Sequence, residues 1–340
     1  MQSLRPETPE QLAEALRDSA SRHRAIRLGG NFSKDRLGGP IGEADVVVST
    51  SALGRLLCYD PRDLTISVEA GMPWSELERT LAEHRQMLPL DPPWRASSTV
   101  GGVIAANLSG PRRRLYGTAR DMIIGMTFAT LEGKRIQSGG MVVKNVAGLD
   151  MAKLMVGSFG TLAAIAIVNF KVVPAPVESR TFVLEFATAG EAFAERDRVL
   201  RGVLQPSAID IVNWPSGFRM WIQAGGSAAV LDRFSRELAG ARSADESAWD
   251  EIREFTPEFL AANPRGAVVP IAAKLTEMSG IMANLNVPAI ARAGSGVIYA
   301  HYAAGAPAVA WSGDFAMMEK VKNMFDPERL LNRGRLHGRI

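Results

Sequence analysis

Residues 98–126 read STVGGVIAANLSGPRRRLYGTARDMIIGM, and in this stretch glycine interrupts each apolar run after a few residues. The same pattern continues through residues 142–165, VVKNVAGLDMAKLMVGSFGTLAAI. The chain has 32 glycines among its 340 residues, and they are densest between Gly101 and Gly160. Clustered glycine lets backbone lie close to a ligand or to other backbone. The pattern therefore predicts a region of close backbone approach.

Two glycine turns have the composition of an anion cradle. In RLGGNFS, residues 27–33, two glycines let backbone N–H groups converge, and Asn31 and Ser33 can add donors. Taken alone, this turn has a plain β-turn as its simpler interpretation. The second turn, residues 98–102, leads into an apolar helix, and helix N-termini bind anions. Two such turns, about seventy residues apart, indicate a diphosphate site better than either one alone.

Several classes of protein are excluded by what the sequence lacks. It contains no G-x-G-x-x-G, no phosphate loop, no H-E-x-x-H and no G-x-S-x-G. A net charge of +3 is too small for a nucleic-acid binder, and the run Arg112–Arg114 fits a solvated loop or an anion contact equally well. One cysteine and four scattered histidines offer no disulfide and no metal-ligand spacing. We expect no metal.

The chain also shows no targeting segment. Its first residues, MQSLRPETPEQLAEAL, have no apolar core of signal-peptide length. No stretch approaches the roughly 20 apolar residues of a membrane helix. We therefore expect a cytoplasmic protein, with any membrane contact made through a partner subunit.

The remaining pattern predicts two successive α+β regions. In the first, Thr8 caps a helix with Gln11 completing a capping box, and Pro73 starts a second helix. After Pro176 the order is βαββα, which is typical of a ferredoxin-like domain, with 243–264 as an insertion or helical excursion. Strands are expected at 25–28, 46–48, 64–69, 162–173, 181–186, 208–212, 220–223, 268–271, 289–292 and 296–302, and helices at 192–200, 228–238 and 317–325.

Residues 26–174 resemble the FAD-binding domain of the family that includes vanillyl-alcohol oxidase and p-cresol methylhydroxylase. The matching pieces are RLGGNFSK, ISVEAGMPWSELERTL and the two glycine-rich stretches quoted above, in the same order. Within the family, NLSGPRRRLYG and VVKNVAGLDMAKLMVGSFGTL are most similar to the FAD-binding subunit of glycolate oxidase. FDPERLLNRGRL resembles the family's closing motif, although Asn332-Arg333-Gly334-Arg335 replaces the usual Asn-Pro-Gly-Arg.

The resemblance implies an α+β protein in three parts. A p-cresol methylhydroxylase-type FAD-binding domain would span residues 1–175, and a smaller ferredoxin-like α+β domain would span residues 176–310 on the substrate side. Residues 311–340 would form a tail that returns to the flavin domain.

The resemblance also implies the residues that contact FAD. We expect about half of them to touch the cofactor, since several glycines could serve tight packing alone. Relatives that attach FAD covalently use His at the position of Asn31 or Cys near the second turn; this chain has neither, so its FAD should be non-covalent. The implied cofactor-binding residues are Arg27, Gly29, Gly30, Asn31, Ser33, Ser98, Thr99, Val100, Gly101, Gly102, Asn107, Ser109, Gly110, Tyr116, Gly117, Asp121, Gly157, Ser158, Gly160, Thr161, Ile165 and Asn332.

No catalytic residue follows from the sequence. Oxidation of a hydroxy acid by flavin needs a base or a metal, and the resemblance implies paired histidines and an acidic residue in relatives with that activity. Here the second region has only His301, which we expect to be a packed residue. Lys144, Arg219, Lys274 and Arg292 could bind a carboxylate, but surface roles are expected for each.

The resemblance implies the FAD-binding subunit of a glycolate (2-hydroxy acid) oxidase or dehydrogenase complex. It would work beside a catalytic flavoprotein subunit and an iron–sulfur subunit, because this chain has no cysteine cluster for such a centre. Two alternatives stay open. One is a self-sufficient FAD-dependent oxidoreductase of a small alcohol or hydroxy acid, and the other is a non-catalytic scaffold with an empty flavin fold.

Overall fold

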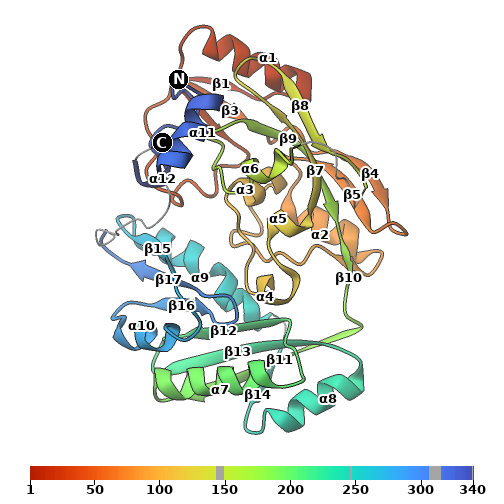
Figure 1. The fold of residues 1–340 in the computed structure, drawn as a ribbon, viewed down its shortest axis with the longest axis vertical. Helices are drawn as coiled ribbons and strands as arrows, with labels where there is room; N and C mark the ends of the chain where they lie inside the picture. Colours follow the sequence, from red (N-terminus) through yellow and green to blue (C-terminus); the bar gives the residue numbers. More distant parts are fainter. Residues whose placement is uncertain (143–148, 246, 306–314, 339) are drawn as a thin grey trace.

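The structure is a computed structural model that describes residues 1–142, 149–245, 247–305, 315–338 and 340. Figure 1 shows two lobes, with α11 and α12 beside the N-terminal elements of the first lobe. The first lobe holds a three-stranded and a five-stranded sheet, and the second is built on a seven-stranded sheet. This mixture of helix and sheet confirms the α+β fold class.

The three-stranded sheet is parallel and has the order β1 (Gln2–Leu4), β3 (Val46–Ser49), β2 (Ile26–Gly29). Helix α1 (Pro9–Ala20) buries Leu12 and Leu16 against this part of the core. Thr8 caps the helix by accepting the Gln11 N–H at 3.2 Å, as expected. The capping box is not completed as expected, because Gln11 Oε1 accepts from Glu7 N–H at 2.8 Å, one residue further back.

The five-stranded sheet is antiparallel, with the order β4 (Leu56–Asp60), β5 (Thr65–Glu69), β9 (Ala164–Lys171), β7 (Ile123–Ala129), β8 (Arg135–Gly139). Every residue of β5 is buried. Trp74, Leu77 and Leu81 of α2 (Trp74–Ala82) pack on this core, as their helical spacing predicts. The short helices of this lobe are α3 (Val100–Ala105), α4 (Arg113–Tyr116), α5 (Ala119–Met122) and α6 (Ala152–Met155).

A two-stranded pairing of β6 (Gln86–Met87) with β10 (Val173–Pro174) marks the exit from the first lobe. The chain then enters β11 (Glu178–Phe186), which is the second strand from one edge of the seven-stranded sheet in the second lobe. In Figure 1 this connection runs down one side of the molecule from β10 to the lower sheet.

The seven-stranded sheet of the second lobe is antiparallel. Its order is β14 (Arg242–Ala244), β11, β13 (Phe218–Gly226), β12 (Ala208–Val212), β16 (Ala289–Arg292), β17 (Val297–Tyr302), β15 (Ala267–Ala272). The first four strands have the 4-1-3-2 order of a ferredoxin-like sheet. The fourth strand is β14, within the segment expected to be an insertion. The strand expected at 268–271 is β15, which forms the opposite edge of the sheet and lies outside these four strands.

Helices cover both faces of this sheet. Side chains of α7 (Ala189–Arg201), α8 (Ala228–Glu237) and α10 (Met278–Asn284) share one hydrophobic core with Ile209 and Ile211 of β12. Helix α9 (Ala248–Ala262) packs on the other face, where Trp249 and Ile252 meet Trp221. Figure 1 places α9 between this sheet and the first lobe. Among the described residues, no helix is both long and apolar enough to cross a membrane.

The chain ends beside β2. After α11 (Phe315–Phe325), Leu331 forms a parallel bridge with Ile26, and α12 (Arg335–Gly338) follows. Lys322 of α11 is buried, and its Nζ contacts Asp326 Oδ2 at 2.6 Å and the Thr161 carbonyl at 2.8 Å. Residues 315–338 therefore belong with the first lobe in space, although the second lobe separates them in sequence.

Candidate functional site

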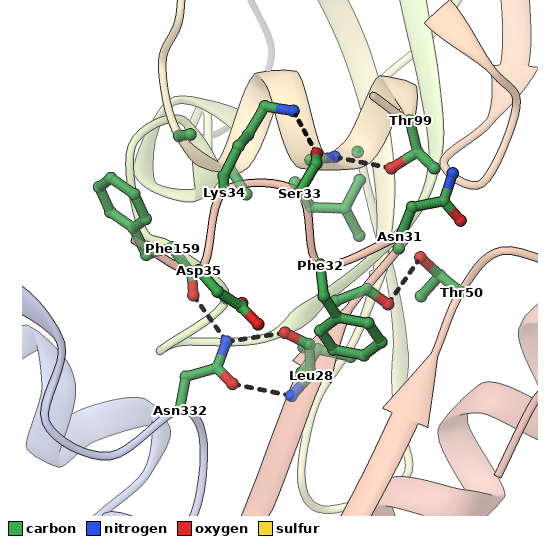
Figure 2. A pocket seen from close by; sticks show the side chains of 18 of the residues that line it. Leu28, Asn31, Phe32, Ser33, Lys34, Asp35, Thr50, Thr99, Phe159 and Asn332 are labelled. Carbon is green, nitrogen blue, oxygen red and sulfur yellow. Dashed lines mark hydrogen bonds between the residues drawn. The ribbon is translucent and has the colours of Figure 1, made fainter. Parts of the chain in front are cut away.

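A cavity opens in the first lobe where the loop after β2 faces α3, the loop before β9 and the C-terminal segment (Figure 2). Its empty space, counted out to the opening, is about 660 Å³. Much of that space is open to solvent, and the enclosed part measures about 80 Å³. Its lining residues are Leu28, Gly29, Gly30, Asn31, Phe32, Ser33, Lys34, Asp35, Thr50, Thr99, Gly101, Gly102, Ala105, Ala106, Phe159, Gly160, Ala163, Ile165, Asn332 and Arg335.

The loop after β2 offers a run of backbone donors to this cavity. Within the part of the chain that the structure describes, the N–H groups of residues 30–34 donate no hydrogen bond. Gly30 lets this loop approach α3, because a Cβ there would lie 2.2 Å from Thr99 Oγ1. A series of unpaired N–H groups around a concave site is an anion-binding arrangement. The loop of the first predicted cradle therefore keeps backbone donors that have no partner among the described residues.

The second predicted cradle lacks such donors. The Gly101 N–H donates to the Ala70 carbonyl at 2.7 Å, and the Gly102 N–H donates to Thr99 Oγ1 at 3.2 Å. The Val103 N–H is bonded to the Thr99 carbonyl at 3.0 Å. The N–H groups of Gly101, Gly102 and Val103 are therefore already bonded within the protein, and the structure does not support an anion site formed by them. Residues 98–102 contribute to the cavity wall through side chains and through the space that their glycines leave open.

Lys34 is a charged group in the cavity wall that the sequence interpretation missed. Its side chain is buried, and its Nζ donates to Ser98 Oγ at 2.5 Å and to Ser33 Oγ at 3.1 Å. Burial lowers the pKa of Lys34 to about 8, and the charge of Glu254 opposes this shift. Figure 2 shows Lys34 directed toward α3 from the loop after β2. In the sequence, the signal that could have identified Lys34 was its position inside RLGGNFSK, one of the stretches that resemble the FAD-binding family.

Charged residues also fix the end of the same loop. Asp35 forms ion pairs with Arg27 and with Arg335, whose Nη2 lies 3.2 Å from Asp35 Oδ1. Arg335 Nη1 also donates to the carbonyls of Asp35 and Leu37 at 2.9 and 2.5 Å. Arg27 lies over the ring of Phe32 at 4.8 Å from its centroid. These contacts hold the loop in place without using the N–H groups of residues 30–34.

Asn332 joins three segments at one end of the cavity (Figure 2). Its Oδ1 accepts the Leu28 N–H at 2.7 Å, and its Nδ2 donates to the carbonyls of Leu28 at 3.0 Å and Phe159 at 2.7 Å. Gly160 leaves room for this amide, since a Cβ there would lie 2.8 Å from Asn332 Nδ2. The side-chain amide is thus engaged with backbone, which makes Asn332 a positioning residue of the cavity wall.

The structure brings part of the predicted FAD-contacting set to the cavity and leaves the rest elsewhere in the first lobe. Asp121 caps α5 by accepting from Thr118, and Val100 is buried in the core. Ser109 Oγ is buried without a hydrogen-bond partner among the described residues. The predicted residues that line the cavity are Gly29, Gly30, Asn31, Ser33, Thr99, Gly101, Gly102, Gly160, Ile165 and Asn332; those that do not are Arg27, Ser98, Val100, Asn107, Ser109, Gly110, Tyr116, Gly117, Asp121, Gly157, Ser158 and Thr161.

His301 is a packed residue, as expected. It is fully buried, with Nε2 2.8 Å from Thr256 Oγ1 and Nδ1 3.2 Å from the Pro288 carbonyl. The rings of Phe255 and Phe259 lie edge-on to it. Burial lowers the pKa of His301 to about 4. Both ring nitrogens are engaged, so this histidine has no free nitrogen for a substrate.

The basic residues considered for carboxylate binding separate into different roles. Lys274 is exposed and pairs with Glu277 at 3.4 Å, as expected for a surface residue. The surface role was wrong for Arg292, which is buried in an ion pair with Asp210. It was also wrong for Arg219, whose largely buried side chain donates to the Trp214 carbonyl. Lys144 lies outside the described residues.

Two arginines of the run Arg112–Arg114 contact the second lobe rather than solvent alone. Arg112 Nε donates to Gln223 Oε1 at 3.2 Å in the second lobe. Arg114 donates to the Pro206 carbonyl at 3.2 Å and to Gln205 Oε1 at 2.5 Å. Two of the three arginines therefore join the lobes, a role that depends on residues about a hundred positions away. Within the described ranges, no group of three metal-ligating side chains occurs.

Comparison with known proteins places the chain among flavoproteins. A family model described as "FAD binding domain" matches residues 2–139. Glycolate oxidase subunit GlcE of Escherichia coli (strain K12) is 33% identical over 253 residues, which are 74% of this chain and 69% of that protein. D-lactate dehydrogenase of Anaerostipes hadrus is 28% identical over 167 residues, 49% of this chain but only 35% of that protein.

Solved structures extend the likeness to both lobes. A structure of alkyldihydroxyacetonephosphate synthase has a TM-score of 0.76 with 16% sequence identity, covering 97% of this chain and 76% of that one. At this identity the similarity shows a common fold alone. Together with the sequence matches, it confirms the resemblance seen in the glycine-rich stretches. The chain belongs to the FAD-dependent hydroxy acid oxidoreductase family that includes glycolate oxidase subunit GlcE, and its cofactor is FAD.

Proposed function

We propose that this protein is the FAD-binding subunit of a 2-hydroxy acid oxidase or dehydrogenase complex, of the glycolate oxidase type, and that it holds FAD non-covalently. The observation that carries the proposal is the cavity beside β2. There residues 30–34, whose N–H groups have no partner among the described residues, and the ammonium of Lys34 border one cavity. The similarity to glycolate oxidase subunit GlcE supports the subunit role.

The described residues fit FAD in two respects. Residues 30–34 supply unpaired backbone donors for a diphosphate. At Gly102 a Cβ would enter the cavity and meet only Thr99 Oγ1 at 3.2 Å and Lys34 Nζ at 3.9 Å, so glycine keeps this space open. When bound, FAD would supply a two-electron acceptor for oxidation of the substrate alcohol.

We infer non-covalent attachment from the residue at position 31, in the turn after β2. Asn31 stands where covalently flavinylated relatives are expected to have His, and an amide is no nucleophile. Its Nδ2 donates to the Ser97 carbonyl at 3.2 Å. The chain's one cysteine, Cys58, lies exposed on β4, outside the lining of the cavity.

We further propose that the chain consists of three parts with separate roles. Residues 1–175 would form the flavin domain, residues 176–310 the domain on the substrate side, and residues 311–340 the tail. The tail's contacts with β2 and with the loop before β9 support this division. The described residues of the second lobe supply no free histidine to act as a base, because His301 is buried and engaged. This favours catalysis in a complex over catalysis by this chain alone.

The proposed partners are a catalytic flavoprotein subunit and an iron–sulfur subunit. With a single cysteine in the sequence, an iron–sulfur centre would have to come from another chain. We propose a cytoplasmic location, with membrane contact through those partners.

The first test is the visible absorption spectrum of the purified chain, before and after acid precipitation. We expect a flavin spectrum, with the flavin released into the supernatant as FAD. Yellow colour that stays with the precipitate would contradict non-covalent binding. A colourless chain that takes up no added FAD would favour the scaffold alternative.

A second measurement separates the subunit from a self-sufficient enzyme. Glycolate and D-lactate are added anaerobically to the FAD-loaded chain, alone and together with co-expressed partner subunits, and bleaching of the flavin is followed. We expect bleaching in the complex and none in the isolated chain. Steady turnover by the isolated chain would contradict the subunit role.

A further inference from the structure

We infer that the ammonium group of Lys34 binds the diphosphate of FAD within the cavity beside β2. The inference rests on the cofactor assigned above and names the side chain that supplies positive charge to it. Neither the composition of the turn nor the match to the FAD binding domain singles out this lysine.

The position of Lys34 leaves one of its donors for a ligand. The lysine is only 8% exposed, and its Nζ lies 2.5 Å from Ser98 Oγ and 3.1 Å from Ser33 Oγ. An ammonium group has three N–H donors, so the two serines leave one unused. The space beside Nζ is kept open by Gly102, where a Cβ would lie 3.9 Å from it. A ligand in the cavity can therefore reach this third donor.

The charge of Lys34 has no ion-pair partner among the described residues. Asp35, the acidic residue in the same cavity wall, is paired with Arg27 and Arg335. Glu254 of α9 influences Lys34 electrostatically, but its carboxylate accepts the N–H groups of Trp94 and Arg95 at 3.1 Å each. A buried cation without a counter-ion is costly, and a bound diphosphate would remove that cost.

Proton binding should be coupled to FAD binding at this site. Burial lowers the pKa of Lys34 to about 8 in the cofactor-free protein, against the opposing effect of Glu254. The negative diphosphate stabilises the charged lysine, so the pKa rises on binding. Below pH 8 the lysine is already charged and affinity is greatest. As the pH rises through 8, binding must take up a proton, and affinity falls by about 10-fold at one pH unit above that pKa.

The experiment measures dissociation constants for FAD and for riboflavin, which lacks phosphate, by fluorescence titration of the cofactor-free full chain. The variants are Lys34→Met, which removes the charge at similar length, and Lys34→Arg, which keeps it. At pH 7 we expect Lys34→Met to weaken FAD binding by about 10- to 100-fold, the size of a charge-assisted contact. Its riboflavin binding should change less than about twofold, and Lys34→Arg should recover much of the FAD affinity.

The pH dependence provides a second readout that a purely structural role would not alter. Between pH 7 and pH 9 the wild-type affinity for FAD should fall, whereas that of Lys34→Met should stay level. Equal FAD affinities of wild type and Lys34→Met would overturn the inference. Equal loss of FAD and riboflavin binding by Lys34→Met would also overturn it, since the lysine would then support the fold. A wild-type chain that binds riboflavin but no FAD would overturn the cofactor assignment itself.

Discussion

A Cβ atom at Gly101 would lie 2.8 Å from the side-chain methyl carbon of Ala70 and 3.0 Å from the Ala70 backbone carbonyl oxygen. At Gly102, the next residue, a Cβ would face the cavity instead. The two adjacent glycines therefore serve different purposes. Gly101 allows α3 to pack against the chain after β5, and Gly102 leaves room in front of Lys34.

This difference predicts opposite effects of two substitutions. Gly102→Val should weaken FAD binding by at least about 10-fold while leaving the cofactor-free fold nearly as stable, since valine is no poorer than glycine in a helix. Gly101→Ala should lower the free energy of unfolding by about 1–3 kcal/mol, because the backbone must shift to admit the methyl group. Urea unfolding and FAD titration of both variants check this. A stable Gly102→Val protein with unchanged FAD affinity would contradict it.

From the sequence alone, cavity residues could be predicted where neighbouring residues in the chain determine their position. Gly29, Gly30 and Asn31 follow from the turn after a strand, and the structure places all three in the cavity wall. Lys34 could not be recognised, because a lysine beside serine and aspartate in a polar loop usually points to solvent. Its burial depends on Ser98, 64 residues further along the chain.

At the scale of the element, β2 is held on both sides. β3 pairs with it through backbone bonds, and on the other side residues 330–332 take the place of a further strand. The Ile26 N–H donates to the Leu330 carbonyl at 2.8 Å, and the Asn332 N–H donates to the Ile26 carbonyl at 2.9 Å. The loop that begins at the end of β2 is thus positioned by a segment some 300 residues later in the chain.

Replacing Asn332 tests how much this segment matters to the cavity. Asn332→Leu removes the hydrogen bonds to the backbone of Leu28 and Phe159 and leaves those buried groups unpaired. We expect the free energy of unfolding to fall by about 2–4 kcal/mol and FAD binding to weaken with it. Arg333→Ala, in the same turn but exposed, should change stability by less than about 1 kcal/mol. Calorimetry and FAD titration measure both effects, and equal behaviour of the two variants would contradict the role of Asn332.

Most elements were predictable because their pattern is local. The cap at Thr8 and the stripe of Trp74, Leu77 and Leu81 define two helices without reference to the rest of the chain. β14 was missed because it has only three residues, exposed or half-buried, and pairs at a sheet edge. Such a strand exists because β11 offers it backbone partners, and no periodicity of its own reveals it.

At the scale of the whole molecule, a small set of polar side chains connects the lobes. Arg36 of the first lobe donates to the carbonyls of Asn263 and Gly266, both at 2.8 Å, just beyond the end of α9 in the second lobe. In return, Glu254 of α9 accepts backbone N–H groups of the first lobe. The sequence could not predict these pairs, since each arginine or glutamate reads as an ordinary surface charge until the lobes meet.

Removing the Arg36 contacts should loosen α9 from the first lobe. We expect Arg36→Met to lower the thermal midpoint by about 3 °C and to speed amide hydrogen exchange in residues 260–266. Arg22→Met, at an exposed position of the first lobe, serves as the control and should leave both quantities unchanged. Unchanged exchange of residues 260–266 in Arg36→Met would show that the lobes are held by other contacts.

The pairing of β2 with residues 330–332 also sets an order of events during synthesis. The ribosome makes the turn at residues 29–34 early, yet the amide that secures Leu28 is incorporated 304 positions later. Until Asn332 has left the ribosome, one wall of the cavity is missing, and the strand that leads into the turn at residues 29–34 has only β3 beside it. Loading of FAD would therefore follow translation, and a nascent chain stalled before this segment would remain without cofactor.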